Sequence, residues 1–177
     1  LREPLSSLKR AGLVMITRTD QVTPKTVQRI REKIQRHNRE VPIVEFAHHI
    51  EGLENFSGDR LDVHGLAGQP VLAFSGIGNP AAFRSLLREQ GVEIAEYLEF
   101  EDHHHYDRRD IQQLIAKAEE VSASAIVCTM KDLVKIQVDQ LGGTALWALS
   151  VGMEPAGDDE LMVRELGRIV ELIDSDE

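Results

Sequence analysis

Blocks of apolar residues alternate along the chain with stretches in which apolar positions follow a helical period. Continuous apolar runs and period-two alternation predict strands, and these lie at 13–17, 41–47, 70–75, 92–100, 125–129 and 145–151. Apolar positions three and four residues apart, preceded by capping residues or proline, predict helices, and these cover about 25–38, 80–91, 107–118 and 158–172, with a shorter one from 130. Because strands alternate with helices, the predicted fold class is α/β, with a parallel sheet in α/β/α layers.

The pattern is interrupted between Gly52 and Gly68, where glycines and acidic residues surround the isolated apolar pair Leu61 and Val63. This composition indicates a connector, either a loop or a short hairpin, rather than part of a core. We therefore divide the chain into three parts, namely residues 1–50, a connector or hinge at 51–65, and a smaller α/β domain at 66–177.

Length and composition limit the possible classes of protein. A chain of 177 residues that is 42% hydrophobic can bury one good core, or one core and part of another. The single cysteine, Cys128, excludes a disulfide framework within the chain and fits a reducing compartment. The longest apolar runs have the length of strands, so none predicts a membrane span. The chain begins at Leu1, without Met, in sequence that already looks structured, and we expect it to be part of something longer.

Charge is distributed unevenly along the chain. Residues 1–40 contain ten Lys and Arg against four acidic residues, whereas residues 41–177 contain ten against twenty-six. The first segment would attract phosphates or an anionic membrane surface, and the second would repel them. A helix with solvated arginines explains the first segment equally well. The asymmetry gains weight only if a separate argument introduces a phosphorylated or lipid substrate.

The clearest candidate for chemistry is the run of three histidines at 103–105. It follows the strand predicted at 92–100 and precedes Asp107, which together with Asp110 has the spacing of a helix N-cap and its N3 residue. Loops at the carboxyl ends of parallel strands are where open α/β sheets bind ligands. An extended backbone would turn His103 and His105 to one side and His104 to the other, so the three histidines would not share one role.

Three interpretations of the histidines remain open. The first is a solvated loop in which one histidine caps backbone groups. The second is acid–base chemistry by a histidine that Asp102 or another carboxylate holds in place. The third is a metal site, which is weaker because His103 and His105 supply only two ligands and Cys128 lies in apolar surroundings.

Two further loops follow predicted strands. The strand at 70–75 ends at Ser75, and Gly76 and Gly78 then precede a helix, so they form either an anion-binding nest or a tight turn that needs positive φ. The loop is neither a Walker A loop nor a full dinucleotide fingerprint, because the lysine and the third glycine are missing. Lys131 follows the strand at 125–129, where it would meet a phosphate or, more commonly, pair with Asp132 or another acid.

Several segments together resemble tetraacyldisaccharide 4'-kinase, the lipid A 4'-kinase family. They occur in the family's order and spacing at 1–11, 17–20, 73–80, 102–106 and 129–135. The resemblance implies an enzyme, with ATP and Mg²⁺ as cofactors, that moves the γ-phosphoryl group of ATP to the 4'-hydroxyl of a tetraacylated disaccharide 1-phosphate. The product is lipid IVA, and the place is the cytoplasmic face of the bacterial inner membrane, to which the protein would bind peripherally.

The resemblance also implies a domain plan and partners. The family has two α/β/α domains, the first of the P-loop kind. Residues 1–50 would be the tail of the nucleotide-binding domain and residues 66–177 the smaller domain. The expected partners are the lipid disaccharide, an anionic membrane surface and a missing N-terminal P-loop segment, with no nucleic acid among them.

Individual residue roles follow from the resemblance as well. His103, preceded by Asp102, would pair with an aspartate of the first domain to activate the sugar hydroxyl. Arg2 would steady phosphate charge, and Glu3 would lie near the magnesium ion as its ligand. The remaining matched positions would belong to substrate-binding or structural loops; these are Asp102, Ser75, Gly76, Gly78 and Lys131.

The chain departs from the family pattern in two respects. Met130 stands where the family has glutamate, so no role is given to that position. No Gly-x-x-x-x-Gly-Lys-Ser/Thr motif occurs in these residues, so the P-loop is expected upstream of Leu1 and the chain alone is expected to be inactive. Two alternatives are a non-catalytic α/β binding module and a metal-dependent hydrolase using His103 and His105, although neither explains the segment at 2–4.

Overall fold

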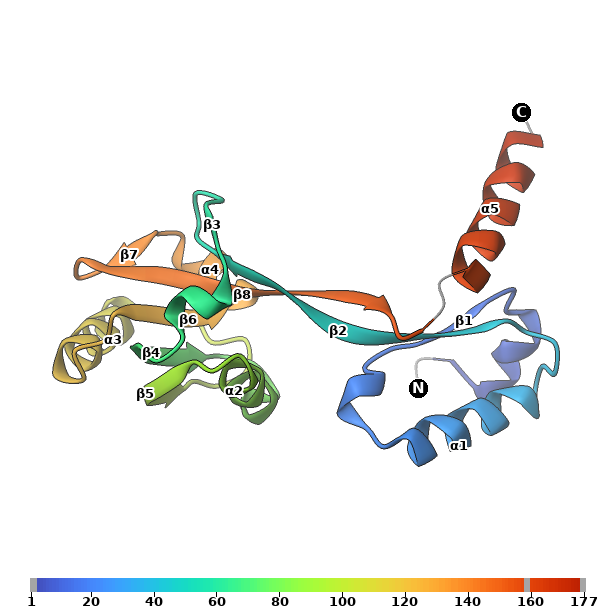
Figure 1. Cartoon of the computed structure of the whole chain (residues 1–177), viewed down its shortest axis with the longest axis horizontal. Helices are drawn as coiled ribbons and strands as arrows, with labels where there is room; N and C mark the ends of the chain where they lie inside the picture. Colours follow the sequence, from blue (N-terminus) through green and yellow to red (C-terminus); the bar gives the residue numbers. More distant parts are fainter. Residues whose placement is uncertain (1–2, 158–159, 176–177) are drawn as a thin grey trace. The chain divides into compact units, whose positions relative to one another are not determined.

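The computed structural model describes residues 3–157 and 160–175 (Figure 1). The described residues form two compact units, which we call unit 1 (residues of 1–49 and 152–177) and unit 2 (50–151). Two long strands, β2 (Ile43–Glu54) and β8 (Thr144–Pro155), each belong partly to one unit and partly to the other. The two units are described separately below.

Unit 2 contains a sheet in which the strands run in the order β8, β6, β4, β5. All three of its neighbouring pairs are parallel, as predicted. The bounds of these strands are Pro70–Ser75 for β4, Glu93–Glu99 for β5, Ala125–Thr129 for β6 and Thr144–Pro155 for β8. The short strand β7 (Gln140–Leu141) pairs antiparallel with β8.

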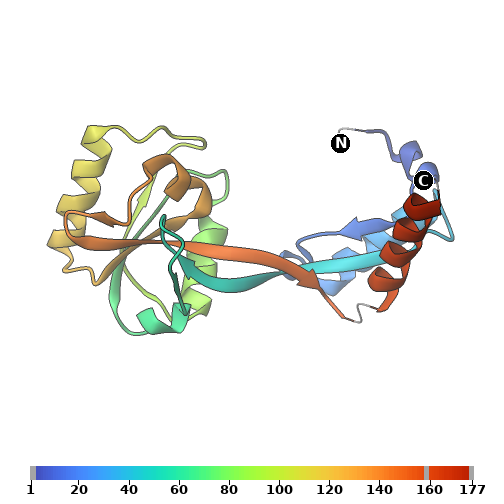
Figure 2. The same ribbon diagram turned by 90° about the horizontal axis from the view of Figure 1, so that it is seen from above.

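The central strand β4 shows why unit 2 has three layers. Its side chains alternate between the two faces of the sheet, so Val71 and Ala73 join one buried cluster and Leu72 and Phe74 join the other. Helix α2 (Pro80–Glu89) packs into the first cluster, whereas α3 (Arg108–Glu120) and α4 (Met130–Ile136) pack into the second (Figure 2). The predicted α/β/α fold class is confirmed.

The stretch predicted as a connector is part of the core of unit 2. The end of β2 (Ile43–Glu54) forms a hairpin with β3 (Arg60–Leu61), and a 3-10 helix, η3 (Val63–Leu66), follows. The hairpin alternative is therefore confirmed, but the expectation that this stretch lies outside a core is wrong. Leu53, Val63 and Leu66 are all buried, because the hairpin and η3 pack on the same face of the sheet as α2.

Unit 1 begins with the predicted β-α-β arrangement. Strand β1 (Val14–Ile16) pairs in parallel with β2, and α1 (Pro24–Gln35) connects them. The Thr23 side chain caps α1 and Pro24 occupies its first turn, as predicted. Two 3-10 helices flank β1, η1 (Leu5–Arg10) and η2 (Thr19–Gln21).

The C-terminal part of the chain groups differently from the predicted division at 66–177. Residues 152–157 and helix α5 (Glu160–Ser175) belong to unit 1. The physical reason is that β8 is longer than the predicted strand and continues beside β2. At its end the backbone N–H of Ala156 donates to the Glu45 carbonyl at 2.8 Å. The predicted caps of the last helix, Asp158 and Asp159, lie outside the described residues.

Candidate functional site

A buried carboxylate joins the loops at the carboxyl ends of β4, β5 and β6. Asp132 is fully buried in the first turn of α4. Its carboxylate accepts hydrogen bonds from Thr129 Oγ1 at 2.7 Å, from Tyr106 Oη at 2.9 Å and from the Gly76 backbone N–H at 3.3 Å. Three of the five segments that carry the family resemblance, 73–80, 102–106 and 129–135, therefore meet at one side chain.

Lys135 balances the charge of this carboxylate. Its Nζ lies 4.0 Å from Asp132 Oδ1 and donates to the His104 carbonyl at 3.0 Å. Burying a carboxylate is costly unless hydrogen bonds and a counter-charge replace its water shell, and here both are present. Burial raises the pKa of the Tyr106 hydroxyl, and the negative charge of Asp132 raises it further. Tyr106 therefore remains a proton donor to the carboxylate at physiological pH.

Gly76 and Gly78 matter because little space is left for a side chain at these positions, and not because the backbone has unusual angles there. Neither has a positive φ, so the tight-turn interpretation is wrong. A Cβ at Gly76 would lie 3.1 Å from both Tyr106 Oη and the Glu101 carbonyl, and one at Gly78 would lie 3.3 Å from Asp102 Oδ2. The loop after β4 thus packs closely against the histidine loop. Because the Gly76 N–H donates to Asp132, it is not available to an anion.

Ser75, the last residue of β4, is buried. Its hydroxyl hydrogen-bonds with Tyr97 Oη from the neighbouring strand β5. The ring of Tyr97 in turn carries the Arg84 guanidinium, whose carbon lies 4.1 Å from the ring centroid. Ser75 therefore links β4 to β5 beneath the loops, and in this position it supports the site rather than facing a ligand.

The three histidines have different surroundings. His104 Nε2 lies 2.7 Å from Asp110 Oδ2, and its ring packs against Phe100 with the centroids 4.9 Å apart. His103 has a φ of 62° and a side chain that is 83% exposed, and its Nε2 lies 4.0 Å from Asp102 Oδ2. His105 is exposed. The different surroundings of His104 and its two neighbours agree with the predicted difference in orientation, but they arise from a turn at His103 and not from an extended strand.

The helix start that holds His104 was predicted correctly. Asp107 caps α3, and the reciprocal hydrogen bond from its backbone N–H to Asp110 Oδ2 completes a capping box. Partial burial would raise the pKa of Asp110, but the hydrogen bonds from Asp107 N–H and from His104 outweigh it and hold that pKa below its ordinary value. The carboxylate that fixes His104 therefore remains charged over the physiological range.

Lys131 does not make the predicted ion pair. Its side chain is exposed at the start of α4 and has no ion-pair partner within the described part of the chain. The lysine near Asp132 is Lys135 instead, because it follows three residues later on the same helical face. Sequence reasoning missed Asp132, Tyr106 and Lys135 as site residues, although Thr129 and Asp132 already had the spacing of a helix cap.

Two predicted residues remain, of which one lies in unit 1 and the other lies outside the part of the chain that the structure describes. Arg2 lies outside the described residues. Glu3 accepts hydrogen bonds from Ser7 Oγ at 2.6 Å and from Arg10 Nη2 at 3.3 Å. Among residues 3–157 and 160–175, no group of three or more His, Cys, Asp or Glu side chains is arranged to hold a metal ion. The metal site on His103 and His105 thus has no third ligand there.

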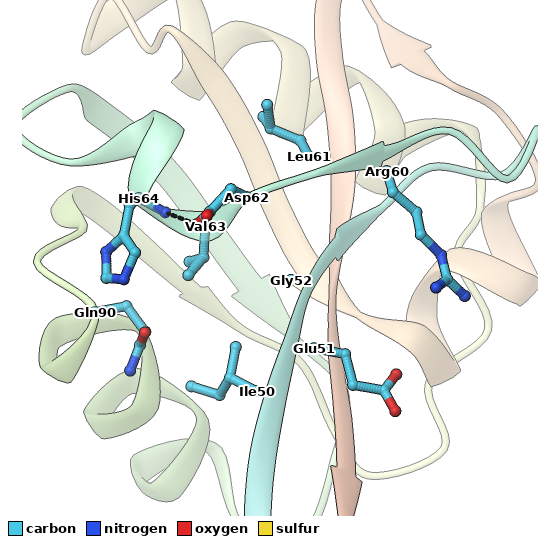
Figure 3. A pocket seen from close by; sticks show the side chains of 9 residues that line it. All are labelled: Ile50, Glu51, Gly52, Arg60, Leu61, Asp62, Val63, His64 and Gln90. Carbon is cyan, nitrogen blue, oxygen red and sulfur yellow. Dashed lines mark hydrogen bonds between the residues drawn. The ribbon is translucent and has the colours of Figure 1, made fainter.

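A hollow of about 370 Å³ lies elsewhere in unit 2 (Figure 3). Its walls come from the end of β2, from β3 and η3, and from the residue after α2. His64 and Gln90 approach each other across it, whereas Glu51 and Arg60 point away from them (Figure 3). His64 and Gln90 precede β4 and β5, so this hollow is not at the carboxyl ends of these strands. We place the candidate site at the carboxyl ends, where the histidine loop and the loop after β4 meet.

Comparisons with known proteins agree with the resemblance found in the sequence. The model of the family described as tetraacyldisaccharide-1-P 4'-kinase matches residues 1–170. A tetraacyldisaccharide 4'-kinase from Halothermothrix orenii is 31% identical over 151 residues, which are 80% of this chain and 39% of the relative. Another from Anaeromyxobacter sp. (strain Fw109-5) is 30% identical over 161 residues, 90% of this chain and 43% of the relative. The chain thus spans about two fifths of their length.

A solved structure shares the fold. The crystal structure of LpxK from Aquifex aeolicus, described as a complex with ATP, matches with a TM-score of 0.61 at 22% sequence identity. The match covers 96% of this chain and 46% of that one. Both described units therefore follow elements of a known α/β protein.

Proposed function

The chain belongs to the tetraacyldisaccharide-1-P 4'-kinase family, and on that premise we propose that it supplies part of a kinase acting on a lipid disaccharide. The reaction is transfer of the γ-phosphoryl group of ATP to the 4'-hydroxyl of tetraacyldisaccharide 1-phosphate, which gives lipid IVA. The observation that carries this proposal is the meeting of three family segments at Asp132, at the end of the sheet where α/β proteins bind ligands.

In this proposal His103 is the residue that helps to activate the sugar hydroxyl. Its exposed imidazole stands on a turn that is anchored by the His103 backbone N–H, which donates to the Gly76 carbonyl at 3.2 Å. An imidazole nitrogen can accept a proton, and an aspartate from the rest of the enzyme would orient it toward the sugar hydroxyl. Phosphoryl transfer depends mainly on positioning and charge stabilisation, which is why the support for this turn matters.

Asp132 supplies that support from below the loop. By binding both the Gly76 N–H and the Tyr106 hydroxyl, it fixes the loop after β4 and the histidine loop to α4. Asp102, beside Gly78, extends the contact between the two loops toward solvent. Lys131 is exposed at the start of α4 and is free to meet phosphate charge of the substrate.

ATP and Mg²⁺ would be held largely by residues outside this chain. Its 177 residues contain no Gly-x-x-x-x-Gly-Lys-Ser/Thr loop to cradle the phosphates. Arg2 would steady phosphate charge. The Glu3 carboxylate is a suitable oxygen ligand for Mg²⁺, although here it accepts hydrogen bonds from Ser7 and Arg10. We therefore propose that these residues alone do not turn over ATP.

The place of action in this proposal is the cytoplasmic face of the bacterial inner membrane, with peripheral attachment. Within the described ranges, no helix has the length and apolar character needed to cross a bilayer. An acylated substrate is embedded in the membrane by its chains, so its kinase has to work at the lipid surface.

A chimaera tests the reaction and the role of His103 together. Residues 1–177 would replace the matching segment of the Halothermothrix orenii relative, and transfer of labelled phosphate to tetraacyldisaccharide 1-phosphate would be measured. We expect His103→Ala to lower the rate by about a hundredfold or more, as for loss of a general base. His105→Ala, two residues further along the chain and also exposed, is the matched control and should keep most of the activity.

Two results would count against the proposal. Equal rates for the two alanine variants would remove His103 from the chemistry. No product from a folded chimaera would favour the non-catalytic binding module instead. The chain alone serves as a further arm, in which detectable ATP turnover would contradict the expectation that a P-loop from elsewhere is needed.

A further inference from the structure

Helix α1 presents a row of cations on the side that faces away from its unit. The row, which we call the cationic stripe, consists of Lys25, Arg29, Lys33 and Arg36. Spacings of four, four and three residues place these side chains on one helical face. Val27 and Ile34, on the opposite face, are the buried residues of α1. Because the opposite face is the one packed against the sheet, the stripe faces outward.

The stripe lacks the partners that usually neutralise such side chains. All four of its residues are exposed, and none forms an ion pair with any residue within 3–157 or 160–175. Arg31 differs, because it lies off the stripe and pairs with Glu45 on β2. Glu32, three residues after Arg29 and four before Arg36, accepts a hydrogen bond from Gln28 at 3.3 Å.

The cationic surface continues past the end of the helix. Arg36 and Arg39 line an open hollow of about 670 Å³ together with Glu32 and Gln35. From Lys25 to Arg36 the stripe extends about 16 Å, at 1.5 Å per residue. A long, shallow row of flexible cations fits a surface that carries many negative charges better than it fits a single small anion.

We propose that the cationic stripe of α1 docks unit 1 on anionic lipid headgroups. This inference rests on the proposed function, since a substrate with acyl chains and a phosphate has to be met at a lipid surface. Charge complementarity selects this face, because residues 41–177 carry a net charge of −16 and would be repelled by anionic lipids. Arginine and lysine at this spacing therefore determine which side of unit 1 approaches the membrane.

Vesicle binding by the 177-residue chain tests the inference directly. Sedimentation with vesicles of equal parts phosphatidylglycerol and phosphatidylethanolamine would be compared with sedimentation with phosphatidylcholine vesicles. We expect binding to the anionic vesicles only, weakening as salt is raised. The triple variant Arg29→Gln, Lys33→Gln, Arg36→Gln should bind about a hundredfold more weakly, since each cation near an anionic surface contributes about fivefold.

A matched variant controls for the loss of three charges. Arg88→Gln, Arg108→Gln and Arg109→Gln remove three exposed cations from unit 2, and binding should be nearly unchanged. Circular dichroism would establish that both variants keep their helices. Equal weakening by the two triple variants, or no weakening by the stripe variant, would overturn the inference. Binding to duplex DNA as tight as binding to anionic vesicles would overturn the choice of lipid as partner.

The vesicle assay uses neither ATP nor phosphoryl transfer, so its failure differs from failure of the proposed function. If the chain does not bind anionic vesicles but the chimaera makes product, only this inference is overturned. A chain that binds them through the stripe while a folded chimaera makes no product would overturn the kinase proposal alone.

Discussion

The two units differ in how completely they bury their apolar side chains. In unit 2, Leu72, Phe74, Leu114 and Leu146 have no exposed surface, and buried clusters cover both faces of the sheet. The core of unit 1 is smaller, and its buried hydrophobic residues in the described part of the chain remain 5–8% exposed; they are Ile16, Val27, Ile34, Val41, Ile43, Val44 and Phe46. Since buried apolar area is the main favourable term in folding, unit 2 is expected to be the more stable unit.

The exposed apolar residues of unit 1 reinforce this difference. Met15 on β1 is 50% exposed, and β1 is the last strand on its side of the sheet. On α5, Val163, Leu166 and Val170 are exposed at spacings of three and four residues, which places them on one face. Apolar surface left in water contributes nothing to stability. The three family segments that meet at Asp132 therefore lie in the unit that has the more fully buried core.

The largest expected effect concerns local opening of the two units. Cys128 is fully buried on β6, and burial, with Asp132 nearby, raises the pKa of its thiol. We expect labelling of Cys128 by a thiol reagent to be on the order of a thousandfold or more slower than in urea-unfolded chain, because it requires an opening of several kcal/mol. Amide hydrogen exchange of α1 and β1 should be faster than that of β4 and β6. Equal protection of both units would contradict the expected difference in their stability.

Loss of the buried carboxylate should have the next largest effect. Asp132→Ala leaves the Tyr106 hydroxyl, the Thr129 hydroxyl and the Gly76 N–H without their shared acceptor. We expect unit 2 to lose about 3–5 kcal/mol of unfolding free energy. Denaturant titration followed by fluorescence of the single tryptophan, Trp147 on β8, would measure it. Asp20→Ala in unit 1 is the control and should change this transition little; a loss below about 1 kcal/mol for Asp132→Ala would contradict the role given to it.

Two glycine substitutions compare the packing of the units directly. Gly76→Ala places a Cβ 3.1 Å from Tyr106 Oη and from the Glu101 carbonyl, so we expect it to destabilise unit 2 by about 1–3 kcal/mol. Gly167→Ala in α5 meets nothing within 4 Å and should stabilise that helix by about 0.5–1 kcal/mol. Thermal unfolding of the two variants measures both. A neutral Gly76→Ala would show that the histidine loop is loosely packed.

The smallest effect compares two histidine–carboxylate pairs, one in each unit. His48 Nδ1 lies 2.9 Å from Asp20 in unit 1, and His104 Nε2 lies 2.7 Å from Asp110 in unit 2. In both pairs partial burial raises the carboxyl pKa, but hydrogen bonds outweigh it. These bonds come from His48 for Asp20, and from Asp107 N–H and His104 for Asp110. Both pKa values are therefore below the ordinary 3.8.

The sign of the pH dependence follows from these lowered pKa values. Each carboxylate contributes stability that is fully present above pH 3.8 and is lost as the pH falls through its folded pKa. Carbon-detected NMR titration of the aspartate carboxyl groups would measure both values. A carboxyl of Asp20 or Asp110 that titrates at or above its ordinary pKa would show that its histidine pair does not persist in solution.

The local structure of this protein could be predicted from its sequence. Thr23 with Pro24, and Asp107 with Asp110, were recognised as helix starts because a capping side chain bonds to backbone only two or three residues away. A carboxylate was also expected beside a histidine, and Asp110, six residues after His104, has that position. The alternation of apolar strands with helices along the sequence likewise predicted the parallel α/β fold class.

Which residues make the site depends on contacts between segments that are distant in sequence. Asp132 is buried because its donors come from Gly76 and Tyr106, which are 56 and 26 residues away in sequence. Gly76 has to lack a side chain because another loop lies against it, and no local angle reveals that. The extension of β8 to Pro155 also depends on its neighbour β2, since strand pairing is a contact between distant segments. Hydrogen bonds between residues that are close in sequence can be predicted from the sequence. Burial and close contacts arise only when distant segments pack together.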